Sequence, residues 1–263
     1  LTSLNCAGNQ ITMLTIKNCP NLSILDCSGN LLTKLDLSAL NQLTELNCSG
    51  NTLTRLMLNT KKTLEKLDCS KNTLSLLDLT GYSNLIAVNC SENLISELNT
   101  KGAYKLKEID CRSNQLHALS VEHLNNLKAL NCSDNPLGTL HFNSTLKELY
   151  CYETALTELT IPELCKLEIL YCYKTPLTAL DVTNAHSLKE LECFDTQITE
   201  LNLKNNEELY RLDCSSAKLT KLDLSANKKL TALLCSNNKL TDLDVSMLYE
   251  LENLCCEQNR ISV

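Results

Sequence analysis

The chain has 263 residues, an apolar content of 43%, a charged content of 21% and a formal net charge of −7 at pH 7. These values are typical of a globular chain, no apolar run is long enough to span a bilayer, and an acidic chain lacks the basic surface needed to bind nucleic acid or an anionic membrane. The 58 Leu and 16 Cys are in excess, whereas the aromatic residues are eight Tyr, two Phe and no Trp. A core of branched aliphatic and small sulfur side chains, without large rings, predicts many thin and similar layers.

The cysteines define an internal repeat. Thirteen of the 16 Cys form one column in which neighbours are 21 residues apart, except for one step of 19. A Leu stands five positions before every member, and apolar residues stand two positions before it and five positions after it. A fixed period of this length predicts a solenoid of stacked coils. The column consists of Cys6, Cys27, Cys48, Cys69, Cys90, Cys111, Cys132, Cys151, Cys172, Cys193, Cys214, Cys235 and Cys256.

Each coil opens with a Leu-x-Cys alternation, at residues 4–6 in the first coil and 254–256 in the last, with Val88 and Ile109 replacing Leu in two coils. A period of two predicts one strand per coil, and strands stacked about 4.8 Å apart form a parallel sheet. A second apolar pattern follows, as in residues 35–37 and 222–224. It predicts a short extended or turn segment on the convex side, with the sheet on the concave side. The short period leaves no room for a full helix.

The repeat unit reads L-x-x-L-x-C-S-x-N-x-L-T-x-L-D-L-S, followed by a turn. It resembles the leucine-rich repeat, and its 21-residue form with Cys in the third apolar position is similar to the bacterial nested subclass called IRREKO. The resemblance covers the whole chain. It implies an α/β-class solenoid of about 13 coils whose concave sheet binds a protein or peptide. It also implies an extracellular or cell-surface location, because bacterial proteins of this kind are often exported.

An Asn column follows the strand by a few residues, and the resemblance implies that it forms an asparagine ladder. An amide can both donate and accept, so each Asn is expected to satisfy backbone groups in its own coil and the next. Four coils lack this Asn, and we expect them to turn differently or to use water. The substitutions are Thr154, Thr175, Thr196 and Ala217.

The regular Cys column predicts a small buried apolar filler between Leu columns. Metal ligation is disfavoured because it needs clustered ligands, and disulfides are disfavoured because parallel side chains hold the Cβ atoms too far apart. Three other Cys, at positions 19, 165 and 255, lie outside the column. Cys255 alternates with Cys256, so we expect it to face the concave side as the best candidate for a reactive thiol.

Three columns of each strand should face outward, at three positions before, one before and one after the repeat Cys. In the first seven coils the position before Cys alternates strictly between Asn and Asp, from Asn5 to Asn131. Interposed Asn separates charges that would otherwise repel each other at the strand spacing. A solvated sheet face that satisfies its own hydrogen bonds explains this pattern, and a calcium or polar-ligand surface is the alternative.

The same columns change after Cys151. Three coils there hold five of the ten aromatic residues, surrounded by acidic side chains. We name this set, within residues 148–215, the aromatic–acidic patch, and we expect Tyr150 to stack beside Tyr171 and a second row to consist of Tyr152, Tyr173 and Phe194. Its rings are Tyr150, Tyr152, Tyr171, Tyr173 and Phe194, and its charged residues are Glu148, Glu190, Glu192, Asp195, Arg211 and Asp213. The rings either cover and stabilise the sheet through cross-strand pairs, or form a contact surface, since aromatic residues are enriched at interfaces.

The carboxylates of Glu190, Glu192 and Asp213 should lie close together, a pattern compatible with glycoside hydrolysis. An open sheet neither excludes water nor raises an acid's pKa by burial, however, and no phosphate loop or nucleophile motif occurs. We therefore predict a non-catalytic module without cofactor or metal. Two ligand classes remain, a protein or peptide and a carbohydrate, and the absence of Trp disfavours the carbohydrate.

No linker interrupts the repeat, so we predict a single domain over residues 1–263. The chain begins inside the repeat signature and stops in mid-repeat, and no capping element is visible at either end. A solenoid normally caps its ends, because they expose core and unpaired strand edges. The sequence is therefore interpreted as an excised or processed fragment, or as one that associates end to end.

Overall fold

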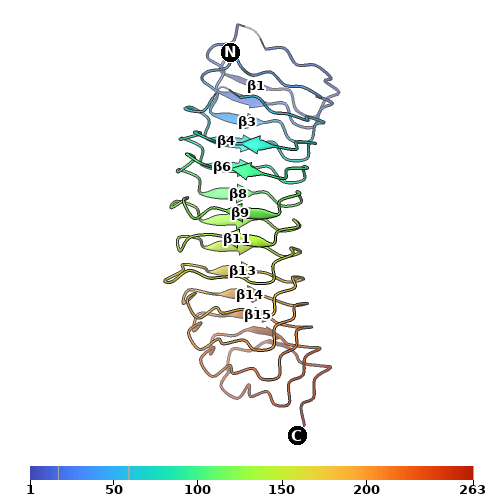
Figure 1. The fold of residues 1–263 in the computed structure, drawn as a ribbon, viewed down its shortest axis with the longest axis vertical. Coiled ribbons are helices and arrows are strands. Elements are labelled where there is room, and N and C mark those ends of the chain that lie inside the picture. The colour runs from blue at the N-terminus through green and yellow to red at the C-terminus, as the bar shows by residue number, and fades with distance from the viewer. Residues whose placement is uncertain (17, 59, 263) are drawn as a thin grey trace. The chain divides into compact units, whose positions relative to one another are not determined.

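The computed structural model describes residues 1–16, 18–58 and 60–262. The chain divides into two compact units, Leu1–Asn131 and Cys132–Val263, and each is described here by itself. In both units the chain winds in successive coils that each contribute one strand to a parallel sheet, and the described residues contain no helix (Figure 1). The predicted repeat solenoid is confirmed. The prediction of one domain stays a prediction, and its last residue, Val263, lies outside the described residues.

The first unit contains seven strands of the main sheet, paired in parallel and in register. Residues 21 positions apart face each other, as Leu4 faces Leu25 and Leu46 faces Leu67. The strands are β1 (Ser3–Asn5), β2 (Ile24–Asp26), β3 (Glu45–Asn47), β4 (Lys66–Asp68), β6 (Ala87–Asn89), β8 (Glu108–Asp110) and β10 (Ala129–Asn131).

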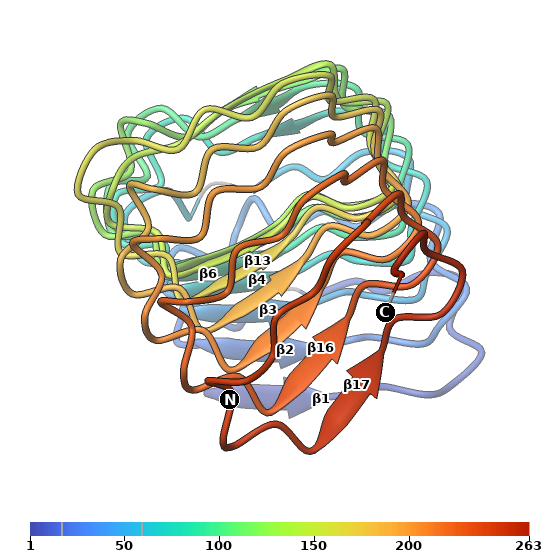
Figure 2. The same ribbon diagram turned by 90° about the horizontal axis from the view of Figure 1, so that it is seen from below.

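The second unit contains six strands with the same pairing. Figure 2 shows β13, β16 and β17 along the same side of the coils. The shortened repeat keeps this ladder, because the Cys132 N–H donates to the Tyr150 carbonyl at 2.9 Å just as the Cys151 N–H donates to that of Tyr171. The strands are β12 (Glu148–Tyr150), β13 (Ile169–Tyr171), β14 (Glu190–Glu192), β15 (Arg211–Asp213), β16 (Ala232–Leu234) and β17 (Asn253–Cys255).

The second apolar pattern forms the short extended segments that the sequence predicts. In the first unit β5 and β7 pair in parallel, and in the second unit Leu180 and Leu201 form an isolated bridge. The segments are too short and irregular to form a continuous second sheet. The strands among them are β5 (Leu77–Asp78), β7 (Leu98–Asn99), β9 (Ala118–Ser120) and β11 (Thr139–His141).

The core consists of the Leu and Cys columns, as predicted. Eleven successive Cys of the column, from Cys27 to Cys235, are at most 1% exposed. Burial raises the pKa of the Cys90 and Cys132 thiols to about 12, so they are neutral at physiological pH. Cys255 is exposed, as expected for a side chain on the outward face.

The Asn column forms a ladder that links each coil to the preceding one. The Asn72 Nδ2 group donates to the carbonyls of Cys69 in its own coil and Cys48 in the preceding coil, both at 3.1 Å. Its Oδ1 accepts the Leu53 N–H at 2.9 Å, also in the preceding coil. The expectation of bonds to the next coil was therefore wrong. The strand ends before each Cys carbonyl, which is left without a ladder partner and, wherever the following coil has the Asn, accepts its amide N–H.

The coils without Asn lose this link but keep the turn. The Thr175 hydroxyl donates only to the carbonyl of Cys172, in its own coil, at 2.6 Å. The residue before it, Lys174, has φ of 51°, and its counterpart in an Asn coil, Lys71, has φ of 53°. The expectation that these coils turn differently was therefore wrong. Backbone bonds between coils fix the turn, because the Lys174 N–H donates to the Phe194 carbonyl at 2.9 Å.

A second, shorter amide ladder lies at another corner of the second unit and was not expected. Asn206 and Asn227 are completely buried. The Asn206 Nδ2 group donates to the carbonyls of Val182 and Ala185 at 3.1 and 2.8 Å, and that of Asn227 donates to the Leu203 and Asn206 carbonyls. These residues replace apolar side chains at a turn, where each amide adds a hydrogen bond to backbone carbonyls that already accept one backbone N–H.

Restoring the missing amide at Ala217 should stabilise the second unit. In Ala217→Asn, the new Nδ2 group can reach the carbonyls of Cys193 and Cys214, and its Oδ1 can accept the Ile198 N–H. We expect the free energy of unfolding to rise by about 1–2 kcal/mol in urea denaturation, the net value of one or two hydrogen bonds. Asn238→Ala, which removes an Asn that already forms these hydrogen bonds, should lower the free energy of unfolding. An unchanged or lower stability of Ala217→Asn would contradict this account.

Candidate functional site

The strand register brings the residues of the aromatic–acidic patch together on the outward face of the second unit's sheet. Tyr150 is the direct partner of Tyr171, and Tyr171 that of Glu192. The Leu residues between them on the same strands point into the core, where Leu149 and Leu170 are fully buried. The alternation that packs the core therefore also fixes the outward direction of the patch side chains.

Three rings form a continuous stack. The Tyr152 and Tyr173 ring centroids are 4.4 Å apart with planes at 7°, and those of Tyr173 and Phe194 are 4.3 Å apart with planes at 9°. These distances are close to the spacing of neighbouring strands, so the sheet itself sets the separation of the rings. The row predicted from the sequence is therefore formed.

The other predicted pair meets edge to face. The ring centroids of Tyr150 and Tyr171 are 5.3 Å apart and their planes are at 85°, whereas the sequence suggested rings side by side in a stack. Hydrogen bonds explain the difference. The Tyr171 hydroxyl donates to the Glu190 carboxylate at 2.6 Å, and the Tyr150 hydroxyl donates to that of Glu148 at 3.3 Å.

The five rings are half-buried rather than fully exposed, because they cover one another. Burial raises the pKa of Tyr150 to about 12, and the negative charge of Glu148 adds to the shift. Burial likewise raises the pKa of Tyr173 to about 12 and shifts that of Tyr171 upward. The phenols therefore remain protonated donors, in a preformed surface of fixed rings.

The carboxylates of the patch are held by specific partners. Glu192 pairs with the Arg211 guanidinium at 3.1 Å and is only 14% exposed, and burial raises its pKa despite that pairing. The Glu190 carboxylate accepts hydrogen bonds from the hydroxyls of both Tyr171 and Tyr210. Tyr210 was missed by the sequence analysis, since it lies four positions before its Cys and outside the three columns that were considered.

The charges at the border of the patch are paired, and those beside its rings are partly unpaired. Glu168 binds the ammonium groups of Lys147 at 2.5 Å and Lys189 at 2.7 Å, which lowers the pKa of its carboxyl. Asp195 and Asp213, by contrast, have no ion-pair partner among the described residues. Negative charge beside the rings is therefore not neutralised by an ion pair within the described residues.

The outward face of the first unit largely satisfies its own hydrogen bonds. The Asp68 carboxylate accepts the N–H and hydroxyl of Ser70 at 3.0 and 2.6 Å, and Asn89 donates to Asp68 at 3.4 Å. This is the role expected for the interposed amide. Across residues 1–16, 18–58 and 60–262, no group of three or more His, Cys, Asp or Glu is placed to hold a metal ion.

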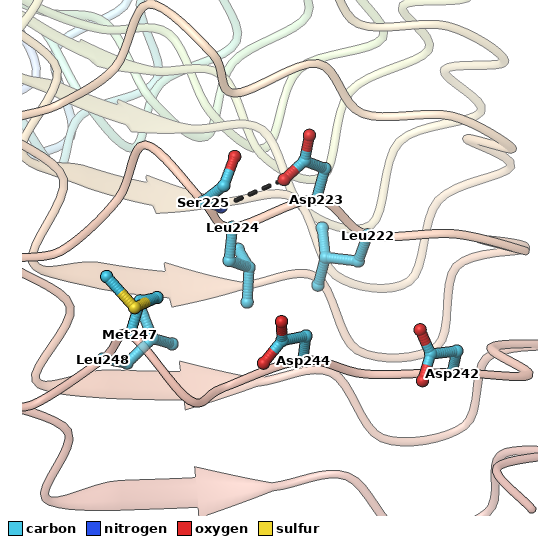
Figure 3. A pocket seen from close by; sticks show the side chains of 8 residues that line it. All are labelled: Leu222, Asp223, Leu224, Ser225, Asp242, Asp244, Met247 and Leu248. Atoms are coloured by element: carbon cyan, nitrogen blue, oxygen red, sulfur yellow. Dashed lines mark hydrogen bonds between the residues drawn. The ribbon is translucent and has the colours of Figure 1, made fainter.

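Cavities occur on the second extended segments, away from the patch. One of about 250 Å³ is lined by Asp223, Asp242 and Asp244 beside apolar side chains (Figure 3). The Asp223 and Asp244 carboxylates each accept the N–H of the residue two positions on, and these bonds lower their pKa. These acids therefore stabilise local turns. In the first unit, a cavity of about 650 Å³ is lined by residues that include Arg55 and Tyr82.

No family model and no curated protein matches the chain. Among solved structures, it is similar to the functional domain of InlJ from Listeria monocytogenes, which includes a cysteine ladder. The two share 37% identity at a TM-score of 0.91, over 97% of this chain and 58% of that one. The leucine-rich effector YopM from Yersinia pestis shares 27% identity at a TM-score of 0.73, over 98% of this chain and 78% of YopM. The chain is a leucine-rich repeat protein.

A further leucine-rich repeat neighbour is the internalin InlF from Listeria monocytogenes. It shares 22% identity at a TM-score of 0.88, over 100% of this chain and 82% of InlF, and supports the fold alone. The buried Cys column of this leucine-rich repeat chain corresponds to the cysteine ladder that the InlJ domain includes. The chain spans 58% of the length of that InlJ domain.

The raised pKa values predict how the patch responds to alkali. The fold favours the neutral phenol, so the stability that Tyr150 and Tyr173 confer is complete below pH 10, the value for an unfolded chain. It is lost as pH rises through the folded value of about 12. Absorbance at 295 nm should show tyrosines that ionise near pH 12, fewer of them in Tyr150→Phe/Tyr173→Phe. Complete ionisation of the folded wild type by pH 11 would refute this assignment.

Proposed function

We propose that the chain is a non-catalytic binding module that contacts a protein or peptide through the aromatic–acidic patch. The leucine-rich repeat class supports a protein-interaction module in general terms. The observation that carries the proposal is the gathering of five rings, and of carboxylates without an ion pair within the described residues, on one outward face of β12–β15 and the turns that follow these strands. In the first unit, the same columns hold no aromatic side chain.

The patch has the physical properties of a binding surface. Its rings are held in place before any partner arrives, so binding would cost little side-chain entropy. Tyr supplies apolar area together with a hydroxyl, a combination enriched at interface hot spots. The ring pairs also stabilise the sheet by about 0.5–1.5 kcal/mol each, so the patch combines both roles that the sequence suggested.

The carboxylates favour binding over catalysis. The Glu190 carboxylate accepts hydrogen bonds from two phenols, and the Glu192 carboxylate pairs with a guanidinium. Neither carboxylate is therefore free to act as the general acid or the general base of a hydrolytic pair. The surrounding surface is an open sheet, which does not exclude water from a reacting bond.

A carbohydrate ligand is the alternative, and the ring geometry disfavours it. Sugars stack on open ring faces, whereas both faces of Tyr173 are covered by its neighbours in the stack. Apart from the two ends of the stack, the surface presented there consists of ring edges and hydroxyls. A glycan array tested beside a displayed peptide library separates the two classes, and binding to glycans alone would favour the alternative.

An extracellular or cell-surface location in a bacterium is part of the proposal. It is supported by the likeness to the InlJ domain of Listeria monocytogenes. The part of the chain that the structure describes contains no candidate membrane-spanning helix.

Removing two rings of the stack should abolish binding while the fold survives. Peptides are first selected from a displayed random library with the wild-type chain, and their Kd is measured by calorimetry. In Tyr152→Ala/Tyr173→Ala we expect a loss of affinity of at least tenfold, about 1.4 kcal/mol. The matched control is Tyr249→Ala, which removes an exposed ring outside the patch. Binding at wild-type affinity in a folded double variant would overturn the proposal.

A further inference from the structure

The ring stack of the patch ends at Phe194. One face of this ring lies against Tyr173, and the next position in the same column is Ser215. Neighbouring strands are about 4.8 Å apart, so Ser215 occupies the layer in which a fourth ring would stand. A serine side chain extends only one atom beyond Cβ, whereas a phenyl ring carries six carbons there. Most of the second face of Phe194 is therefore not covered from this position.

The ring contacts of Phe194 lie on one side only. No other ring and no cation of the described residues stacks on this second face. The Arg211 guanidinium, the nearest cation on the neighbouring strand, is engaged by Glu192 through both Nε and Nη2, at 3.2 and 3.1 Å. The Ser215 N–H is engaged by the Asp213 Oδ1 at 3.0 Å.

Negative charge surrounds this layer. Asp195 directly follows Phe194 in the chain and is exposed. Asp213 stands two residues before Ser215 on the same face of β15, and only one of its oxygens is engaged by the Ser215 N–H. The charge of Asp213 also raises the pKa of Glu192. The slot thus combines one open aromatic face with two carboxylates that form no ion pair within the described residues. The Lys174 ammonium, which pairs with Glu153, also interacts electrostatically with Asp195.

We propose that this slot binds an arginine side chain of a peptide or protein partner. Its guanidinium lies flat on the open face of Phe194 as the fourth layer of the stack and pairs with Asp213, while Asp195 adds a second negative charge. This inference rests on the proposed function, because it names the chemistry of the partner at the same patch.

Arginine fits the slot better than other side chains do. Its guanidinium is planar, stacks on aromatic faces and presents a fork of N–H donors to a carboxylate. Lysine carries a compact, strongly hydrated charge that cannot fill a flat layer. A neutral aromatic side chain would stack but leave the two carboxylates unpaired, and an anionic one would be repelled.

The direct test is an NMR titration with N-acetyl-arginine methylamide, using the lysine, citrulline and tryptophan counterparts as comparisons. The chain has only two Phe, so the ring signals of Phe194 are assigned by their loss in Phe194→Leu. We expect arginine to shift these signals with a Kd at least fivefold below those of the other three probes. Asp213→Asn, which keeps the acceptor for the Ser215 N–H, should remove that preference. Equal binding of citrulline or tryptophan, or no shift with arginine, would overturn the proposal.

A second variant fills the slot. Ser215→Tyr should continue the stack, keep the melting temperature at or above the wild-type value and abolish the arginine-induced shift. Ser49→Tyr, in the same column of the first unit, is the matched control and should leave the shift unchanged.

The library-selected peptides separate this inference from the proposed function. Their affinity should fall at least fivefold in Ser215→Tyr. If they bind Ser215→Tyr normally but not Tyr152→Ala/Tyr173→Ala, the arginine slot is wrong and the proposed function stands. If they bind both variants normally, the proposed function fails as well.

Discussion

The structure depends on hydrogen bonds between successive coils. No coil can bury its own apolar face, so each relies on the N–H of one strand reaching a carbonyl in the next, as Cys69 reaches Asn89 at 2.9 Å. This ladder fixes the spacing of all columns at once. It packs Leu and Cys in thin core layers, and on the outward face it places any side chain directly over its counterpart in the neighbouring coil. The core and the patch are two results of one constraint.

The fold could be predicted from the sequence because a column repeated in thirteen coils leaves few alternatives. The period of two around each Cys predicts the positions of the strands, and the 21-residue spacing predicts which residues of neighbouring strands face each other. The same reasoning placed Tyr152, Tyr173 and Phe194 in one row, since residues at equal positions must stack. What repeats in the sequence was predictable, because its environment repeats as well.

Features that depend on side-chain direction were not predictable. The Asn ladder reaches the preceding coil because the unpaired carbonyl lies there, which no spacing reveals. The Tyr171 ring lies edge-on to Tyr150 because its hydroxyl donates a hydrogen bond to the Glu190 carboxylate. Tyr210 donates to the same carboxylate, although it belongs to a column that was not expected to reach the patch. Lys174 has the backbone conformation found in coils with Asn, because its N–H donates to a carbonyl in the next coil. This backbone hydrogen bond holds the turn even though Thr175 replaces the ladder Asn.

The central claim is that the outward face of β12–β15 is the contact surface. Hydrogen–deuterium exchange with and without a library-selected peptide tests it most directly, since it covers the whole chain in one measurement. The account predicts slower exchange on binding in segments 148–153, 169–174, 190–195 and 211–216, with no change at the corresponding positions of the first unit. Protection confined to the first unit, or to the second extended segments of the coils, would contradict it.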